Sequence, residues 1–84
     1  MQVAVIGSGY VGLVAAACLA DLGHDVVCID NDPAKIAALQ QGATVIHEEF
    51  LPILLDRHLG KRLQFTTCLS EGLRDSSIIF IAVS

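Results

Sequence analysis

The sequence has few aromatic residues and few basic ones. No tryptophan is present, and aromatic residues make up 5% of the 84 positions, so the core must consist mainly of aliphatic side chains. Such a core, in a chain that is 54% hydrophobic, is typical of a parallel sheet covered by helices and excludes intrinsic disorder. At this length the chain can form one small domain.

Several classes of partner are excluded by what is missing. Five basic residues stand against nine acidic ones, and Lys61-Arg62 is the only basic cluster, so we expect no nucleic-acid partner. No apolar run reaches the roughly 18 residues that cross a bilayer, so we expect no membrane partner. The cysteines are odd in number and lack paired spacing, which favours the reducing cytoplasm and a small core role for each thiol: Cys18, Cys28 and Cys68.

Apolar runs and turn residues predict strands and helices that alternate along the chain. Strands are expected over residues 2–6, 26–30, 63–67 and 77–83, and helices over residues 10–22, 33–42, 48–59 and 70–74. The first helix is apolar nearly all round, so we expect it to be buried on more than one side. The alternation implies an α/β fold with parallel strands and right-handed crossovers.

A G-x-G-x-x-G motif lies between the first predicted strand and the first predicted helix. Gly7 would permit the tight turn, Gly9 would let a pyrophosphate approach the backbone, and Gly12 would let the helix pack closely on the strand. The free N–H groups of the helix and its positive dipole end would hold the phosphates. The motif therefore predicts a dinucleotide-binding turn formed by Gly7, Ser8, Gly9, Tyr10, Val11 and Gly12.

An acidic residue follows the motif at about the spacing that a dinucleotide-binding site requires. Asp30 lies 18 positions after Gly12, at the predicted end of the second strand. Its carboxylate could accept hydrogen bonds from the adenosine ribose and would repel a 2′-phosphate, which favours NAD over NADP. The alternative is a glycine-rich turn with a surface Asp and no ligand, and the strand–turn–helix context argues against it. Lys35 is either a solvated residue of the second helix or a cation beside the ribose, and the sequence does not decide between these.

The other reactive side chains form no recognisable catalytic or metal-binding pattern. His24, His47 and His58 are scattered, and each is interpreted as a surface or loop residue. Glu48 and Glu49 are interpreted as a solvated helix start, because adjacent side chains diverge. We therefore expect no catalytic residue and no metal site within these 84 residues.

Longer segments of the sequence resemble those of a known enzyme family. The run from Val3 to Val14, with Gly-Tyr-Val-Gly-Leu, and the later Leu-Gly-His at residues 22–24 resemble the N-terminus of UDP-glucose 6-dehydrogenases and related GDP-mannose dehydrogenases. The resemblance continues through residues 28–36, 63–67 and 79–83, so it covers essentially the whole chain. We accordingly predict a partial Rossmann fold of about four parallel strands in the spatial order 3-2-1-4.

The resemblance also implies roles for individual residues. The turn at residues 7–12 would bind the NAD pyrophosphate, Asp30 would bind the adenosine ribose, and Lys35 would occupy the family's basic position near it. Val83 and Ser84 would begin the loop on the adenosine side. Residues 47–51 depart from the Tyr-Glu-Pro-Gly-Leu that is common in the family, which bears on the shape of that segment and on the substrate.

The implied parent enzyme oxidises UDP-glucose or a related sugar nucleotide with NAD, in two steps from alcohol to carboxylate. We expect residues 1–84 to be the N-terminal segment of a longer, cytoplasmic, homo-oligomeric enzyme and to lack dehydrogenase activity alone. A non-catalytic nucleotide-sensing or assembly module, or another NAD-dependent dehydrogenase, remains the alternative. The apolar run at residues 78–83 would form a bare sheet edge, so we also expect self-association.

Overall fold

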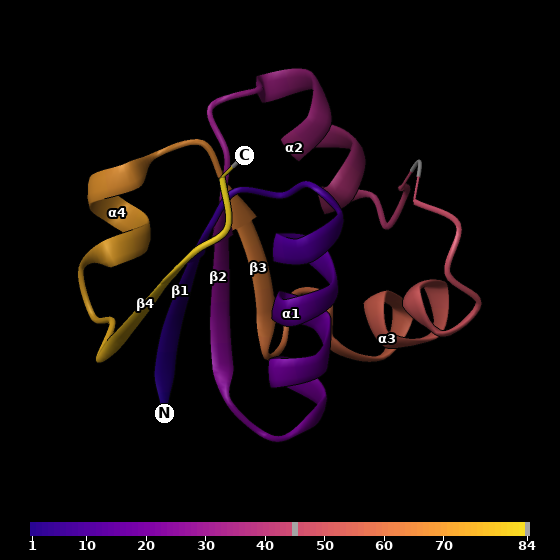
Figure 1. Ribbon diagram of the computed structural model, residues 1–84, viewed down its shortest axis with the longest axis horizontal. Helices are drawn as coiled ribbons and strands as arrows, with labels where there is room; N and C mark the ends of the chain where they lie inside the picture. The colour runs from indigo at the N-terminus through magenta and orange to yellow at the C-terminus, as the bar shows by residue number, and fades with distance from the viewer. Residues whose placement is uncertain (45, 84) are drawn as a thin grey trace.

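The structure is a computed structural model that describes residues 1–44 and 46–83. Strands and helices alternate along the chain, and the helices lie on both sides of one sheet (Figure 1). In chain order the elements are β1 (Gln2–Ile6), α1 (Tyr10–Asp21), β2 (Asp25–Ile29), α2 (Pro33–Gln40), α3 (Phe50–His58), β3 (Leu63–Thr66), α4 (Leu69–Leu73) and β4 (Ile78–Ile81). Every predicted element is present, and the bounds differ by a few residues.

The four strands pair in parallel in the order β3-β2-β1-β4, which confirms the predicted fold and strand order. In the register, Ile6 of β1 lies opposite Ile29 of β2 and Ile81 of β4. The carboxyl ends of these three strands therefore meet at one edge of the sheet. In open α/β sheets, ligands bind outside this edge.

The core lies between the sheet and the helices α1, α2 and α3. It is aliphatic apart from Cys28 and Phe65, and its other buried members are Val3, Val5, Leu13, Ala16, Ala17, Ala20, Val26, Ile36, Leu39, Leu51, Leu54, Leu55 and Leu63. Helix α1 contacts both the sheet and α3, which confirms burial on more than one side. None of the helices formed by the described residues combines the length and apolarity that a bilayer crossing requires.

The prediction of core positions for all three cysteines is wrong for two of them. Cys28 is buried in β2, whereas Cys18 and Cys68 are exposed. The buried stripe of α1 includes Ala16, Ala17 and Ala20, and successive helix positions are rotated by about 100°, so Cys18 falls outside this stripe. Composition alone did not separate the two faces, because the exposed face of this helix is also apolar.

The last two elements show two further differences from the local sequence pattern. Helix α4 begins at Leu69, with Cys68 at its N-cap, one residue before the predicted start at residue 70. Strand β4 has the composition of a buried strand, yet all four of its residues are exposed. It pairs with β1 along one edge, and α1 contacts β1, β2 and β3 instead of covering it.

Candidate functional site

The turn between β1 and α1 needs glycine at two positions for steric reasons. Gly7 has a φ of +105°, which L side chains rarely adopt, and a Cβ there would lie 2.9 Å from the Ala82 carbonyl oxygen. A Cβ on Gly12 would lie 1.8 Å from the Gly7 carbonyl oxygen. The turn can therefore form in this shape only without side chains at these two residues.

Gly9 is different, because nothing in the fold demands a glycine there. Its φ is −71°, and apart from residues 8–10 no atom of the described residues lies within 4 Å of a Cβ placed on Gly9. Gly9 is the N-cap of α1, and no side chain in the described part of the chain caps this helix end. The opening above Gly9 thus combines free space with the N–H groups and positive dipole end that favour an anion.

The carboxylate of Asp30, just after β2, faces this turn. Its Oδ2 accepts hydrogen bonds from the Ser8 backbone N–H at 3.0 Å and from the Ser8 hydroxyl at 2.6 Å. Its Oδ1 accepts from the backbone N–H of Asp32 at 3.1 Å. The Lys35 ammonium lies 3.7 Å from Oδ2, so Lys35 is paired with Asp30 although its side chain is 38% exposed.

These partners keep Asp30 ionised. Burial raises the pKa of this carboxyl, but the hydrogen bonds from Ser8 and Asp32 and the charge of Lys35 outweigh burial, so the net pKa lies below its ordinary value. A carboxylate has about four acceptor positions, and three are used within the chain. One acceptor position on Oδ1 is left for a ligand hydroxyl.

The thiol of Cys28, which lies next to this site, is unreactive. Cys28 lies beneath the turn with its Sγ 3.8 Å from the Gly7 carbonyl oxygen. Burial, together with the negative charge of Asp30, raises the pKa of this thiol to about 12. Cys28 is therefore a packing residue, because the thiolate is the reactive form of cysteine.

The remaining expected residues lie around the same turn, with one exception. Tyr10 and Val11 open α1 and are 56% and 61% exposed. Val83 follows β4, and its backbone nitrogen would lie 3.1 Å from a Cβ on Gly7, so it borders the turn. The prediction for Ser84 falls outside the described residues.

Two contacts that the sequence did not predict join α1 to the segment around α3. The Tyr10 hydroxyl donates a hydrogen bond to Glu48, so Glu48 is more than a solvated helix start. Asp21 Oδ1 accepts from Arg57 Nη1 at 2.9 Å and lies 2.8 Å from His58 Nε2, so His58 is a paired residue whose side chain is only 13% exposed. The partners are 36 to 38 positions apart, and no local pattern in one sequence signals such pairs.

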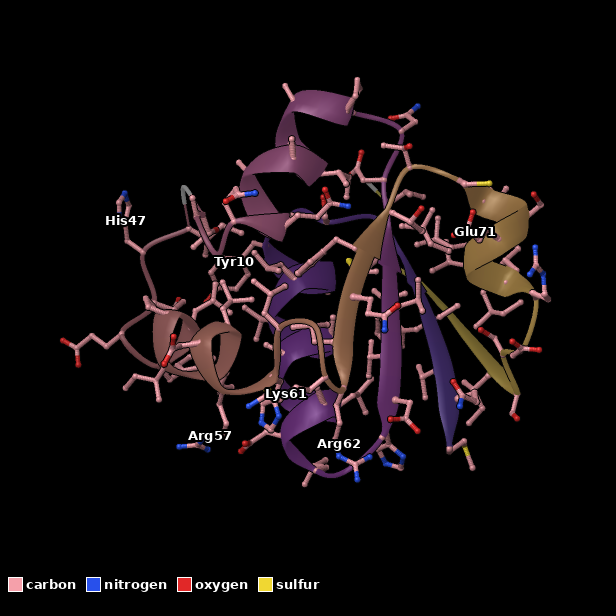
Figure 2. All side chains as sticks on the ribbon, turned by 180° about the vertical axis from the view of Figure 1, so that it is seen from behind. Tyr10, His47, Arg57, Lys61, Arg62 and Glu71 are labelled. Carbon is pink, nitrogen blue, oxygen red and sulfur yellow. The ribbon has the colours of Figure 1, made fainter. Side chains whose placement is uncertain are left out.

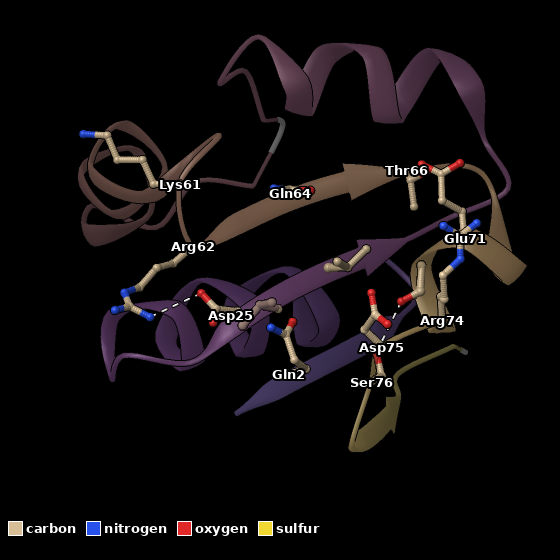
Figure 3. A pocket seen from close by; sticks show the side chains of 13 residues that line it. Gln2, Asp25, Lys61, Arg62, Gln64, Thr66, Glu71, Arg74, Asp75 and Ser76 are labelled. Carbon is tan, nitrogen blue, oxygen red and sulfur yellow. Dashed lines mark hydrogen bonds and ion pairs between the residues drawn. The ribbon is translucent and has the colours of Figure 1, made fainter.

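Two hollows flank the sheet. One of about 550 Å³ opens beside the turn, between Ser8, Lys35 and the apolar side chains of α1 and α2. Another, of about 520 Å³, lies on the sheet face that carries α4, among charged and polar side chains such as Arg62, Gln64 and Arg74 (Figure 3). Since the glycine turn and Asp30 line neither wall of this second hollow, it is separate from the candidate site. No cluster of metal-ligating side chains occurs within residues 1–44 and 46–83.

The residues at the carboxyl edge fit the adenosine diphosphate part of a dinucleotide. At Gly9 the space around an added Cβ is free of other segments of the described chain, and no side chain there caps the start of α1, which is where a helix binds a phosphate. Asp30 is an ionised acceptor that follows directly after the end of β2, the position from which an acid binds the ribose in dinucleotide-binding folds. The geometry therefore supports the prediction of a dinucleotide half-site.

Comparison with known proteins identifies the same kind of domain. The family model described as "UDP-glucose/GDP-mannose dehydrogenase family, NAD binding domain" matches residues 1–84. The UDP-glucose 6-dehydrogenase of Pseudomonas aeruginosa is 48% identical over 84 residues, which are 99% of this chain and 18% of that protein. The enzyme of the same name from Rhizobium meliloti is 46% identical, over 99% of this chain and 19% of its own length.

Solved structures agree with this result. A GDP-mannose dehydrogenase from Pseudomonas aeruginosa, solved as a ternary complex, is 38% identical and superposes with a TM-score of 0.93, covering 100% of this chain and 20% of that one. A UDP-glucose dehydrogenase from Pyrobaculum islandicum is also 38% identical, with a TM-score of 0.89 over 98% of this chain and 19% of its own. The chain thus spans about a fifth of the length of these relatives.

Proposed function

Because the chain belongs to the UDP-glucose/GDP-mannose dehydrogenase family, as an NAD-binding domain, we propose that its glycine turn and Asp30 hold the ADP half of NAD. The observation that carries this assignment is the pairing of an ionised Asp30 with the open approach to Gly9 at one edge of the sheet. Bound NAD would supply the hydride acceptor for the oxidation of a substrate. The residues of this chain bind and orient the cofactor.

Each residue of the half-site has a distinct proposed role. The N–H groups of Tyr10, Val11 and Gly12 face the pyrophosphate, because the first N–H groups of a helix have no partner within it. Asp30 accepts a hydroxyl of the adenosine ribose on its remaining Oδ1 position, and Ser8 fixes the orientation of this carboxylate through two hydrogen bonds.

The other members of the site lie at its border. Lys35 balances the charge of Asp30 and lies next to the ribose. Val83, exposed after β4, begins the adenosine side, and the same role is proposed for Ser84. A 2′-phosphate would lie against the ionised Asp30, so NADP should bind more weakly than NAD.

We further propose that residues 1–84 are the N-terminal segment of a longer cytoplasmic enzyme. That enzyme would form a homo-oligomer and oxidise UDP-glucose, or a related sugar nucleotide, to the uronate in two NAD-dependent steps. The similarity to enzymes named UDP-glucose 6-dehydrogenase supports this proposal. The 84-residue chain should show no turnover of UDP-glucose, since no catalytic nucleophile was recognised in its sequence.

The test is a calorimetric titration of the chain with NAD, ADP-ribose and NADP. We expect NAD and ADP-ribose to bind with a dissociation constant in the roughly millimolar range or tighter, and NADP to bind more weakly. Asp30→Ala should weaken NAD binding about tenfold or more, because a hydrogen bond to a charged group contributes about 1.5–3 kcal/mol.

Asp25→Ala is the matched control. It removes a carboxylate from the opposite end of the same strand, where Asp25 pairs with Arg62. NAD affinity should therefore stay at the level of the unmodified chain. An Asp30→Ala variant that binds NAD as well as the Asp25→Ala variant would contradict the assignment, and so would a chain that binds neither NAD nor ADP-ribose.

A further inference from the structure

Tyr10 joins the glycine turn to a segment far along the chain. Its backbone opens α1, while its hydroxyl donates a hydrogen bond to the Glu48 carboxylate, 38 positions later. Figure 2 shows the Tyr10 side chain between the start of α1 and the segment that carries His47. The ring is therefore held on the side of the molecule where α3 lies, although it is 56% exposed.

Within residues 1–44 and 46–83, two sets of polar side-chain contacts, called ties below, join α1 to the segment around α3, and this bond is one of them. At the other end of α1, Asp21 Oδ1 is paired with Arg57 and His58 at 2.9 and 2.8 Å. Helices α1 and α3 also contact each other directly, and both contribute buried residues to the core. The Tyr10–Glu48 contact adjoins the glycine turn and is called the near tie, whereas the Asp21 contacts at the other end of α1 form the far tie. The far tie can therefore serve as a control for the near one.

Without the hydrogen bond to Glu48, the Tyr10 side chain could adopt a different rotamer. An exposed side chain samples several staggered rotamers, and the space next to Gly9 is open. A ring in that space would lie where the pyrophosphate is proposed to bind. The bond to Glu48 removes this competition and also restrains the backbone of the residue whose N–H faces the phosphate.

We propose that Glu48 is a positioning residue for NAD, which holds the Tyr10 side chain aside and keeps the phosphate opening at Gly9 clear. This inference rests on the proposed NAD half-site. The hydrogen bond needs only an acceptor oxygen at residue 48, which a glutamine also provides. The negative charge of Glu48 is not needed for this role. It would in fact disfavour NAD binding, because a carboxylate near the opening repels a phosphate.

The binding test compares three variants by calorimetric titration with NAD. Tyr10→Phe removes only the hydroxyl, and we expect affinity to fall about fivefold, the factor that corresponds to a net hydrogen bond of about 1 kcal/mol. Glu48→Gln keeps the acceptor, so its affinity should equal or exceed that of the unmodified chain. Asp21→Asn loosens the far tie, so it should lower the melting temperature and leave NAD affinity unchanged.

A second measurement follows the tie directly, because Tyr10 is the only tyrosine in the chain. Phenolate absorbance therefore reports this residue alone. The hydrogen bond to Glu48, and its negative charge, raise the pKa of Tyr10 above the ordinary value. In Glu48→Ala both the hydrogen bond and the charge are lost, so the pKa of Tyr10 should fall towards about 10 while circular dichroism shows that the fold persists.

The outcomes separate the two proposals. If the chain binds NAD and Tyr10→Phe binds it equally well, the positioning role is wrong and the half-site stands. Equal losses of affinity in Tyr10→Phe and Asp21→Asn would indicate general loosening of α3, which also overturns the positioning role. A Tyr10 pKa that is the same in Glu48→Ala as in the unmodified chain would mean that the hydrogen bond to Glu48 is absent in solution. If the unmodified chain binds no NAD, both proposals fail together.

Discussion

At the scale of single residues, the glycines of the turn make different demands on the chain, and this difference can be tested by adding one methyl group. In Gly12→Ala the new Cβ would lie 1.8 Å from a backbone carbonyl oxygen that cannot move freely. We expect a loss of at least about 3 kcal/mol in the free energy of unfolding, the upper range for overpacked sites. Chemical denaturation would measure it.

Gly9→Ala should behave in the opposite way. The methyl group meets open space and φ is ordinary, but alanine is less favourable than glycine at an N-cap, so stability should change by less than about 1 kcal/mol. The same methyl group would occupy the approach to the pyrophosphate, so NAD affinity should fall at least about tenfold. A Gly9→Ala variant that binds NAD normally would show that the phosphate does not approach this residue.

The residue scale also shows what one sequence can and cannot specify. Gly7, Gly12 and Asp30 were found because their spacing follows from local geometry, in which a strand, a turn and a helix succeed one another. The partner of Tyr10 was not found, because the contact between residues 10 and 48 exists only after α3 has packed on α1. Side-chain pairs of this kind form only in the tertiary structure, and they produce no local pattern from which one sequence could predict them.

At the scale of elements, the far tie between α1 and α3 should make their packing sensitive to acid. Hydrogen bonds from His58 and Arg57 lower the pKa of Asp21 below its ordinary value. A carboxyl whose pKa is lower in the folded state stabilises the fold above the ordinary aspartate value of about 4, and this contribution is lost as the pH falls through the lower folded value. The melting temperature should therefore fall as the pH drops below about 4.

Asp21→Asn checks the source of this acid sensitivity. The variant should melt at a lower temperature at pH 7 and should lose less stability than the unmodified chain as the pH falls. Asp30 also has a lowered pKa, so a residual acid dependence should remain in the variant. If the two melting curves run parallel across the acid range, Asp21 does not contribute as the geometry indicates.

Element bounds were predictable wherever a residue has a strong local preference. Asp32 accepts a hydrogen bond from the Lys35 N–H at 3.2 Å and Pro33 occupies the first turn, so α2 begins where these residues predict. The start of α4 was wrong because Ser70 is also a good N-cap residue, and the five-residue helix has little pattern to fix its bounds. The exposure of the β4 side chains could not be predicted from the local sequence, because it depends on which helices cover the sheet.

At the scale of the whole molecule, the strand order follows from a rule of handedness. Right-handed crossovers place β2 and β3 successively on one side of β1, and the helix of the opposite face, α4, returns the chain to the other side. The order places the most apolar strand at an edge, with its residues 42% to 68% exposed. An apolar edge strand with unpaired backbone groups tends to pair with another chain.

We therefore expect the 84-residue chain to self-associate through β4 as its concentration rises, with sedimentation equilibrium as the measurement. Ile79→Lys places a charge on this edge, where Ile79 is 48% exposed, and should weaken association about tenfold or more. Ile53 is a suitable control because it is 58% exposed but lies on α3. If exposed apolar surface of any kind drives association, Ile53→Lys will disperse the chain equally well. If the open edge of β4 drives it, only Ile79→Lys will do so, and a chain that stays monomeric at every concentration would show that this edge is protected in solution.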